Sequence, residues 1–257
     1  MKKQYNKRRK KDSNRNRFIV LFVAIVLVII AIYYLFFQGH STTSTGVYAT
    51  NLTYYPNNSP ITQEGKLVFI YVGAEYCPYC AAERWAIVMA LSHFGNWSNL
   101  EPIYSAPPQI EPNYPNIPTY TFVNAIYKSD KIVFWEVELY NRYGNVSLQK
   151  MNSIEQQLFN TYDPSGGIPF ISIGGIYFRI GSGVSPALFV GLSFQEVQQQ
   201  INSKQGPIYQ AVYQESQQLT NAILNVLNIL SGHVILFYDN NFTMHTAFNL
   251  NSNKAYE

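Results

Sequence analysis

Residues 67–91 read LVFIYVGAEYCPYCAAERWAIVMAL: an apolar run, a short turn, and a pair of cysteines that opens a second apolar segment. The run Leu67–Val72 is continuous rather than alternating, which is typical of a strand buried on both faces. From Cys77 onward the segment is rich in good helix formers, and Pro78 is acceptable in a first helical turn. The sequence therefore predicts a buried strand followed by a central buried helix.

Cys77 and Cys80 are the only two cysteines among 257 residues, and they are three positions apart. At the start of a helix this spacing brings the two sulfurs within bonding reach. We expect the first sulfur to be exposed there, facing unpaired N–H groups and the positive end of the helix dipole, which favour the thiolate. Cys77 would then attack disulfides, and Cys80, one turn further in and more buried, would resolve the mixed disulfide.

Three other uses of the cysteine pair remain open. A closed zinc site needs about four protein ligands. The histidines form no paired motif that could complete such a site; they are His40, His93, His233 and His245. A purely structural disulfide would close a very small loop and would restrict the unfolded chain little. Inert buried thiols are the third alternative. We expect redox chemistry, with no metal and no cofactor.

Downstream of this segment the pattern predicts further strands and helices. Residues 132–140 alternate and predict a strand with one wet face. Capping boxes at Ser153–Gln156 and Ser193–Glu196 predict two helix starts, and Gly174–Gly175 lies between two short apolar runs, the pattern of a hairpin. The apolar stripe of the last helix is interpreted as core packing. The other expected elements are a loop over 96–118 with at most one short strand, a strand over 119–127, helices ending near 162, 202 and 231, and a last strand over 233–238.

Residues 64–204 resemble the thioredoxin fold of thiol–disulfide oxidoreductases: a buried strand, a Cys-Pro-Tyr-Cys pair at a helix start, an Ile-Pro before a Gly-Gly hairpin, and a capped helix. The resemblance implies an α/β domain with a central mixed sheet flanked by helices, to which this chain adds a C-terminal helical extension. It also implies that Ile168–Pro169 is a cis peptide facing the cysteines, with the Ile168 backbone pairing with an extended substrate chain. An ordinary trans proline is the alternative.

Residues 71–85, YVGAEYCPYCAAERW, also resemble a family of membrane-anchored proteins from thermoacidophilic archaea, catalogued as domain of unknown function 929. That name supplies no activity. The chain departs from thioredoxins at Tyr76, where they have Trp, and at the strand Leu67–Val72, which lacks their buried acid. Pro78 and Tyr79 lie between the cysteines as candidate substrate contacts, and we expect Tyr79 to face solvent.

Because that acid is missing, proton transfer to or from Cys80 has no assigned residue. Glu83 and Glu75 are candidates by proximity to the cysteines. For each of them a solvated surface acid is the alternative interpretation.

Residues Phe18–Phe37 form an unbroken apolar run of 20 residues, long enough to cross the hydrocarbon layer as a helix. The preceding tail carries nine Lys and Arg residues and one acid, Asp12, so it should stay in the cytoplasm. The expected organisation is a basic cytoplasmic tail, a transmembrane helix, a polar linker and an extracytoplasmic domain, over residues 1–17, 18–37, 38–63 and 64–257. One alternative is a cleaved signal peptide, although the run exceeds about 7–15 residues and no Ala-x-Ala site follows it. The other is a basic tail that binds RNA, although the basic residues directly precede the apolar run.

The composition argues against a nucleic-acid partner and indicates the compartment in which the domain lies. Residues 18–257 hold 9 basic and 14 acidic side chains, so they lack the basic stripe that a nucleic-acid partner needs. Only 13% of residues are charged, so few ionised pairs can be lost in acid, and we expect an acidic exterior. Five Asn-x-Ser/Thr sequons agree with an outer location; they begin at Asn51, Asn57, Asn96, Asn145 and Asn241.

These observations predict a single-pass, membrane-anchored thiol–disulfide oxidoreductase that acts on exported proteins, with a redox partner in the membrane as a further candidate. Oxidation or isomerisation is expected rather than reduction, given the compartment. The rival is a non-catalytic binding or assembly module that uses the disulfide as a staple.

Overall fold

The computed structural model describes residues 52–232 and two short strands, β11 (Ile235–Tyr238) and β12 (Met244–Ala247), which pair with each other. The chain divides into two units, Met1–Gly46 and Val47–Glu257, and the described residues belong to the second. The expected cytoplasmic tail and membrane span therefore lie outside them. A search of the described residues finds no helix that combines the length and apolarity needed to cross a membrane.

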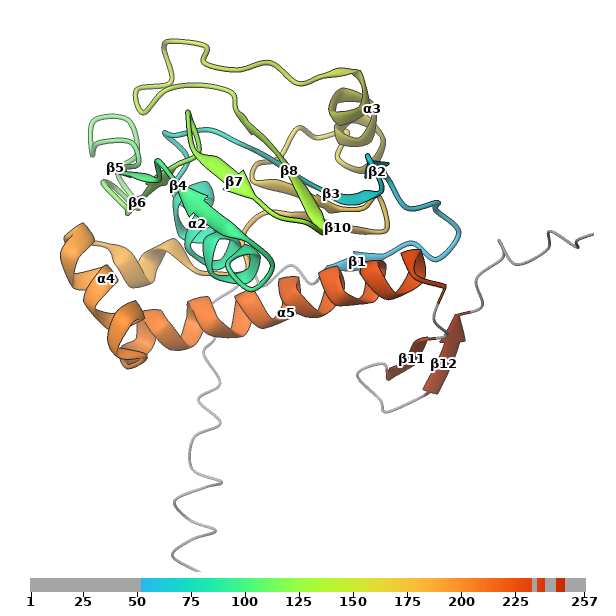
Figure 1. Cartoon of the computed structure of the whole chain (residues 1–257). Coiled ribbons are helices and arrows are strands. Elements are labelled where there is room, and N and C mark those ends of the chain that lie inside the picture. The colour runs from blue at the N-terminus through green and yellow to red at the C-terminus, as the bar shows by residue number, and fades with distance from the viewer. Residues whose placement is uncertain (1–51, 233–234, 239–243, 248–257) are drawn as a thin grey trace, which may run out of the picture. The chain divides into compact units, whose positions relative to one another are not determined.

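A six-stranded mixed sheet forms the centre of the domain (Figure 1). Its central strand, β3 (Lys66–Gly73), pairs in parallel with β8 (Ile132–Glu138) and antiparallel with β9 (Phe170–Ile173). The remaining strands pair antiparallel with these: β10 (Tyr177–Ile180) with β9, β1 (Thr53–Tyr54) with β10, and β2 (Thr62–Gln63) with the start of β3.

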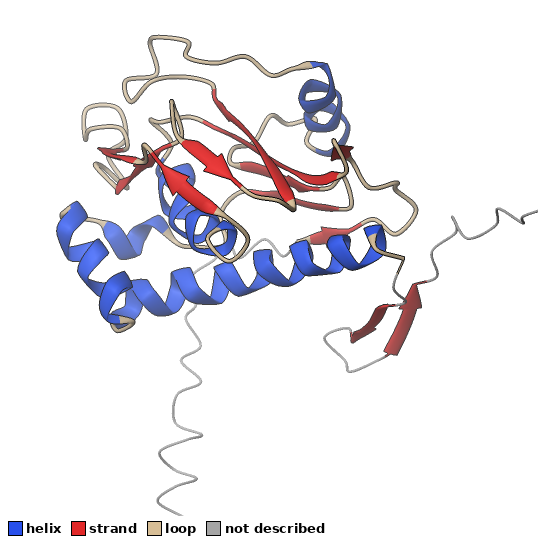
Figure 2. Ribbon diagram, in the orientation of Figure 1, coloured by secondary structure: helices blue, strands red, loops and turns tan. Residues whose placement is uncertain are grey.

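Alternate residues of β3 enter two separate cores, so the strand has no polar face. Leu67, Phe69 and Tyr71 pack in the core that contains α2 (Pro78–Leu91) and α5 (Gly206–Leu230). Val68, Ile70 and Val72 pack instead with residues of α3 (Ser153–Tyr162). The sheet thus separates α3 from α2 and α5 (Figure 2), and the prediction of a strand buried on both faces is confirmed.

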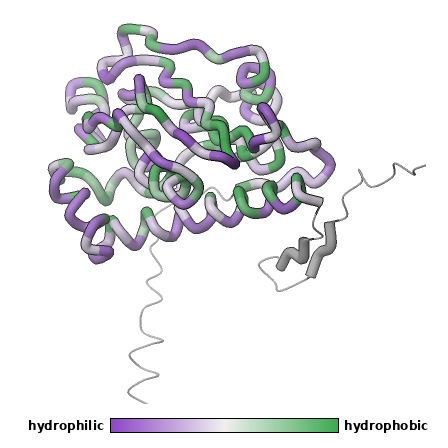
Figure 3. The backbone as a smooth tube through the Cα atoms, in the orientation of Figure 1, coloured by the Kyte–Doolittle hydropathy of each residue, from purple (hydrophilic) through white to green (hydrophobic). Residues whose placement is uncertain are grey.

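The N-terminal caps of α3 and α4 and the long helix α5 agree largely with the sequence prediction. α4 (Phe194–Ser203) starts with the expected box of Ser193 and Glu196. The box of α3 begins one residue earlier than predicted, because the Asn152 side chain accepts the N–H groups of Ile154 and Glu155. Figure 3 shows hydrophobic and hydrophilic segments alternating along α5. Its stripe is core packing as interpreted; the buried positions include Ile208, Val212, Leu219, Ile223 and Val226.

The region between α2 and β8 differs from the prediction. The segment expected as a loop contains β4 (Asn96–Ser98) and β5 (Glu101–Tyr104). The single strand expected over 119–127 is two strands, which pair with different partners: β6 (Pro118–Thr121) with β5, and β7 (Ile126–Lys128) with β4. Aromatic packing holds these small sheets, for example the Trp97 and Phe122 rings stacked 5.6 Å apart. Such long-range contacts leave no local periodicity to detect.

The domain also begins earlier than residue 64. Thr53 and Tyr54 pair with β10, and Thr62 and Gln63 pair with β3, although both pairs lie in the segment expected as linker. Two-residue strands of polar residues carry no alternating pattern, so composition alone favoured a spacer.

Candidate functional site at the start of helix α2

Cys77 is the N-cap residue of α2, with φ −73° and ψ 121°. Its Sγ accepts the backbone N–H of Cys80 at 3.1 Å, which satisfies one of the donors that a helix start leaves unpaired. Both thiols are free. The two cysteines therefore lie at the helix start, as the sequence predicted.

Ile168–Pro169 lies against Cys77 and is a cis peptide, as the thioredoxin resemblance implied. The Cys77 Sγ donates to the Ile168 carbonyl oxygen at 3.8 Å, across 91 residues of sequence. Both cysteines and Ile168 belong to one small cluster, together with Ala74.

The expected exposure of Cys77 is wrong: only 4% of the residue is exposed, and Cys80 is fully buried. Tyr76, Tyr79 and Leu139 pack against the cysteines and account for this cover. Tyr79 itself is half-buried, with its ring edge-on to Tyr114 at 5.9 Å, rather than fully facing solvent. Any reaction at Cys77 therefore requires a partner that enters between these side chains.

Burial raises the pKa of the Cys80 thiol well above its ordinary value, and the hydrogen bond and charge of Cys77 raise it further. The Arg84 guanidinium opposes this shift. Arg84 lies four residues after Cys80, on the same face of α2.

Arg84 and Glu138 form a fully buried ion pair beside the cysteines. Arg84 donates from Nε to Glu138 Oε1 at 2.8 Å and from Nη2 to Oε2 at 2.7 Å, a bidentate geometry. Nη2 also donates to the Ala74 carbonyl at 2.9 Å. Burial disfavours the charged guanidinium, but Glu138 outweighs it and the pKa of Arg84 is raised.

Sequence reasoning missed this ion pair. Glu138 was expected in a strand with one wet face, yet it is fully buried, because the parallel register sets it opposite Gly73 at the end of β3. A usable signal was present: Glu83 and Arg84 interrupt a helix that is otherwise apolar nearly all round, so their charges need buried partners.

The proton-transfer candidates Glu83 and Glu75 make other bonds. Glu83 is fully buried rather than solvated, and its Oε2 accepts the Ser182 hydroxyl and the Gly183 N–H, both at 2.8 Å. Glu75 accepts the Thr121 hydroxyl at 2.7 Å. None of these bonds reaches a cysteine.

Glu83 belongs to a second buried cluster, with Arg179 from β10 and Glu215 from α5. Arg179 lies 3.6 Å from Glu83 and pairs with Glu215. Burial raises the pKa of Glu215 to about 8, and the charge of Glu83 adds to the shift while Arg179 opposes it. One cation between two buried carboxyls thus favours the protonated form of Glu215.

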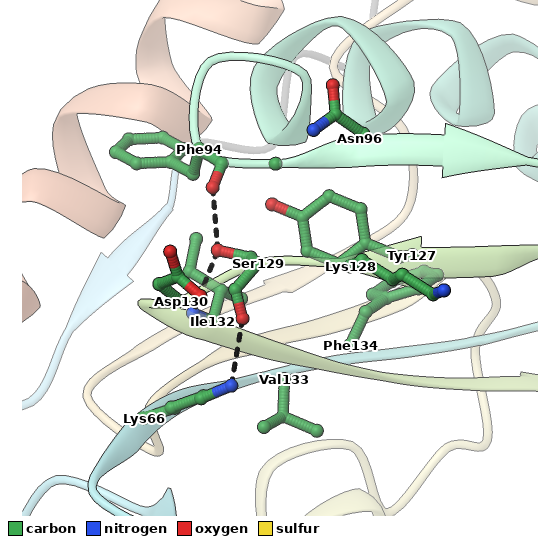
Figure 4. Close-up of a pocket in the computed structure, with 11 residues that line it drawn as sticks. Lys66, Phe94, Asn96, Tyr127, Lys128, Ser129, Asp130, Ile132, Val133 and Phe134 are labelled. Carbon is green, nitrogen blue, oxygen red and sulfur yellow. Dashed lines mark hydrogen bonds between the residues drawn. The ribbon is translucent and has the colours of Figure 1, made fainter.

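A pocket of about 550 Å³ lies at the opposite end of β3, where the strand begins at Lys66 (Figure 4). There Lys66 donates to the Ser129 carbonyl, and the Ser129 hydroxyl donates to the Phe94 carbonyl. β3 has eight residues, so at about 3.3 Å per residue it is about 25 Å long, and the cysteines follow its other end. None of the predicted site residues lines it.

Among residues 52–232 and the two C-terminal strands, no group of three or more His, Cys, Asp or Glu side chains could hold a metal ion.

Comparison with known proteins gives one family match. The sequence model of the family described as domain of unknown function (DUF929) matches residues 53–164 and 164–225, which together make up more than half of the chain. No curated protein and no solved structure shows significant similarity to it.

Proposed function

Because the chain belongs to the family described as domain of unknown function 929, whose description assigns no activity, we propose a function from the site itself. The protein is a thiol–disulfide oxidoreductase that acts through Cys77 and Cys80. The observation that carries this proposal is the position of the Cys77 sulfur, which caps α2 and lies 3.8 Å from the Ile168 carbonyl oxygen.

The order of elements supports a thioredoxin-like domain. A strand, β3, leads into the cysteine helix α2; a parallel strand, β8, follows, then α3, the β9–β10 hairpin and C-terminal helices. β3 lies between its parallel partner β8 and its antiparallel partner β9. The cis Ile168–Pro169 peptide precedes β9 and contacts the cysteine site. A central mixed sheet and a cis Ile168–Pro169 peptide that faces the cysteines are what the resemblance in the sequence implies.

The chemistry follows from the pair being able to form a disulfide. A substrate thiolate attacks Cys77 Sγ, forms a mixed disulfide and releases Cys80 as a thiolate, which keeps the electron pair of the broken bond. A second substrate thiolate then attacks the mixed disulfide and leaves as the substrate's new disulfide, with Cys77 released as a thiolate. The substrate is oxidised by two electrons and the cysteine pair is reduced; the reverse sequence reduces a disulfide.

The apolar run at 18–37 and the basic tail before it support a location outside the cytoplasmic membrane. There the substrates are thiols and disulfides of exported proteins. Oxidation or isomerisation fits an oxidising compartment better than reduction does. Steady turnover in the oxidising direction requires a further partner, a disulfide or a quinone, that accepts two electrons from the reduced pair.

Trapping of mixed disulfides tests this function. In a Cys80→Ala chain, expressed in native membranes, Cys77 cannot be released by its partner, so complexes with exported proteins should accumulate and should dissolve on reduction. The matched control is the chain that also carries Cys77→Ala. Equal amounts of reducible complex in both variants would contradict the proposal.

The near-complete burial of Cys77 favours a second candidate, a binding or assembly module in which the disulfide is only a staple. This candidate predicts that the wild-type disulfide resists a glutathione buffer and that the Cys80→Ala chain traps nothing. The oxidoreductase predicts trapping and a disulfide that equilibrates with glutathione.

A further inference from the structure

Two fully buried donor groups near the cysteines lack hydrogen-bond acceptors among the described residues. They are Nη1 of Arg84 and the hydroxyl of Tyr71. The Arg84 guanidinium lies 5.8 Å from the centre of the Tyr71 ring, so the two side chains are neighbours. Buried donors without acceptors cost about 1–3 kcal/mol each, so an unmade bond at this place calls for an explanation.

Cys80 lies one helical turn before Arg84 on the same face of α2, and it is the group there that changes charge in the proposed reaction. The charges of Arg84 and Cys80 interact, and Tyr71 interacts electrostatically with both. In the reduced protein Cys80 is a buried thiol, which offers only a weak acceptor. When the Cys77–Cys80 disulfide is opened, Cys80 becomes a thiolate, a full negative charge in a dry site.

We propose that Arg84 stabilises the Cys80 thiolate as it leaves the disulfide, and that Glu138 and the Ala74 carbonyl position Arg84 for this task. The proposal rests on the proposed function and assigns its resolving cysteine a partner. In the step concerned, an attacking thiolate bonds to Cys77 Sγ and the Sγ–Sγ bond breaks. The electron pair goes to Cys80 Sγ next to the guanidinium, and no proton has to move.

The geometry makes Arg84 suited to this role and Glu138 suited to hold it. Both Glu138 oxygens are used by Nε and Nη2, so the guanidinium plane is fixed while Nη1 stays unpaired. Glu83, the adjacent acid on α2, is bound to Ser182, Gly183 and Arg179 and does not compete for Arg84.

The first measurement is the pKa of Cys80 by NMR of full-length chain in detergent, labelled with [3-¹³C]cysteine and carrying Cys77→Ser, so that one resonance remains. Replacing Arg84 by Gln should raise the Cys80 pKa by about 1 to 2, because an opposite charge nearby is worth about that much. Glu138→Gln should lower it, because it leaves the Arg84 charge uncompensated. If Arg84 and Glu138 had only a structural role, substitutions of the two residues would not be expected to shift the Cys80 pKa in opposite directions.

The second measurement is the rate at which dithiothreitol reduces the Cys77–Cys80 disulfide in chains that keep both cysteines. A poorer leaving thiolate slows the exchange, so Arg84→Gln should be slower by about tenfold, and Arg84→Lys, which keeps the charge, should recover most of the rate. Arg179→Gln is the matched control: it removes the other fully buried arginine, which does not contact the cysteine site, and should change the rate less than about twofold.

If Arg84→Gln fails to fold, Glu138→Gln carries the test, because it keeps Arg84 and removes only the charge that opposes it. A Cys80 pKa that Arg84→Gln does not raise, or that Glu138→Gln does not lower, relative to the Cys77→Ser parent overturns the proposal. So does an unchanged reduction rate in the presence of a changed pKa. Neither result depends on exported substrates, so failure here is distinct from failure of the trapping experiment.

Discussion

Replacing Glu215 by Gln should remove a large part of the fall in stability that we expect of the domain between pH 4.5 and pH 8. Glu215 and Glu83 approach one cation, Arg179, in a fully buried cluster. The other groups around them are neutral: Ser182 and Gly183 bind Glu83, and Gln218 of α5 accepts from Arg179 at 3.1 Å. The cluster is therefore one positive charge short of neutrality unless a carboxyl keeps its proton.

The sign follows from linkage. The folded-state pKa of Glu215 is about 8, against 4.5 for the ordinary group, so the folded chain binds more protons than the unfolded chain between these values. The stabilising contribution is complete below pH 4.5 and is lost as the pH rises through 8. At about 1.4 kcal/mol per pH unit, the displacement from 4.5 to about 8 sets an upper limit of about 5 kcal/mol.

The assay is urea unfolding of the full-length chain in detergent at pH 4.5, 6, 7 and 8, followed by tryptophan fluorescence. All three tryptophans, Trp85, Trp97 and Trp135, lie in the described domain, so the signal reports on it alone. The difference in unfolding free energy between wild type and Glu215→Gln should shift by several kcal/mol across the series, in favour of the variant at high pH. Glu196→Gln is the control, because the capping carboxyl of Glu196 is exposed and its pKa is lowered by Ser193.

A wild-type chain whose unfolding free energy is flat or rises between pH 6 and pH 8, in parallel with the Glu215→Gln chain, would refute the reasoning. It would mean that Glu215 is ionised throughout and that Arg179 alone compensates both carboxylates.

Three further predictions concern other contacts of the described domain. Arg84→Met should cost about 3–5 kcal/mol, because Glu138 is left as an uncompensated buried charge, whereas Arg84→Met with Glu138→Leu should recover most of that loss in denaturant titration. Gly183→Ala should destabilise the domain, because the added Cβ would occupy the space of the Glu215 carboxyl and of Arg179. The displaced carboxyl should also have a lower pKa, so the loss of stability with rising pH should begin at a lower pH; calorimetry at pH 5 and pH 8 checks both effects. Asn152→Ala should cost about 1 kcal/mol through loss of the α3 cap and should speed amide exchange in the first turn of α3 but not of α4, as hydrogen-exchange mass spectrometry can measure.

The acid cluster bears on the expectation of an acidic exterior. The low charge content predicts only that few ion pairs can be lost in acid. Burial also raises the pKa of Glu136, to about 7, and of Glu155. Because the folded chain holds these protons more tightly than the unfolded chain, we expect both carboxyls to add to stability as the pH falls.

Local sequence determined the elements whose signals are short-range. The continuous apolar run of β3, the helix formers after Cys77, the Gly174–Gly175 hairpin and the box at Ser193 each depend on neighbours within a few residues, and each is present. The cysteine spacing likewise placed both thiols at a helix start without reference to the rest of the chain.

Only the tertiary structure decided which charged residues pair near the site and which side chains bury the cysteines. Glu138 is 54 residues from Arg84, and Glu215 is 36 from Arg179; no periodicity links such positions, and only the parallel register of β8 and the packing of α5 bring them together. The same holds for Ile168, which precedes β9, the strand next to β3, and there contacts Cys77 and helps to bury it. Burial and pairing of charge depend on three-dimensional neighbours, which a linear pattern does not encode.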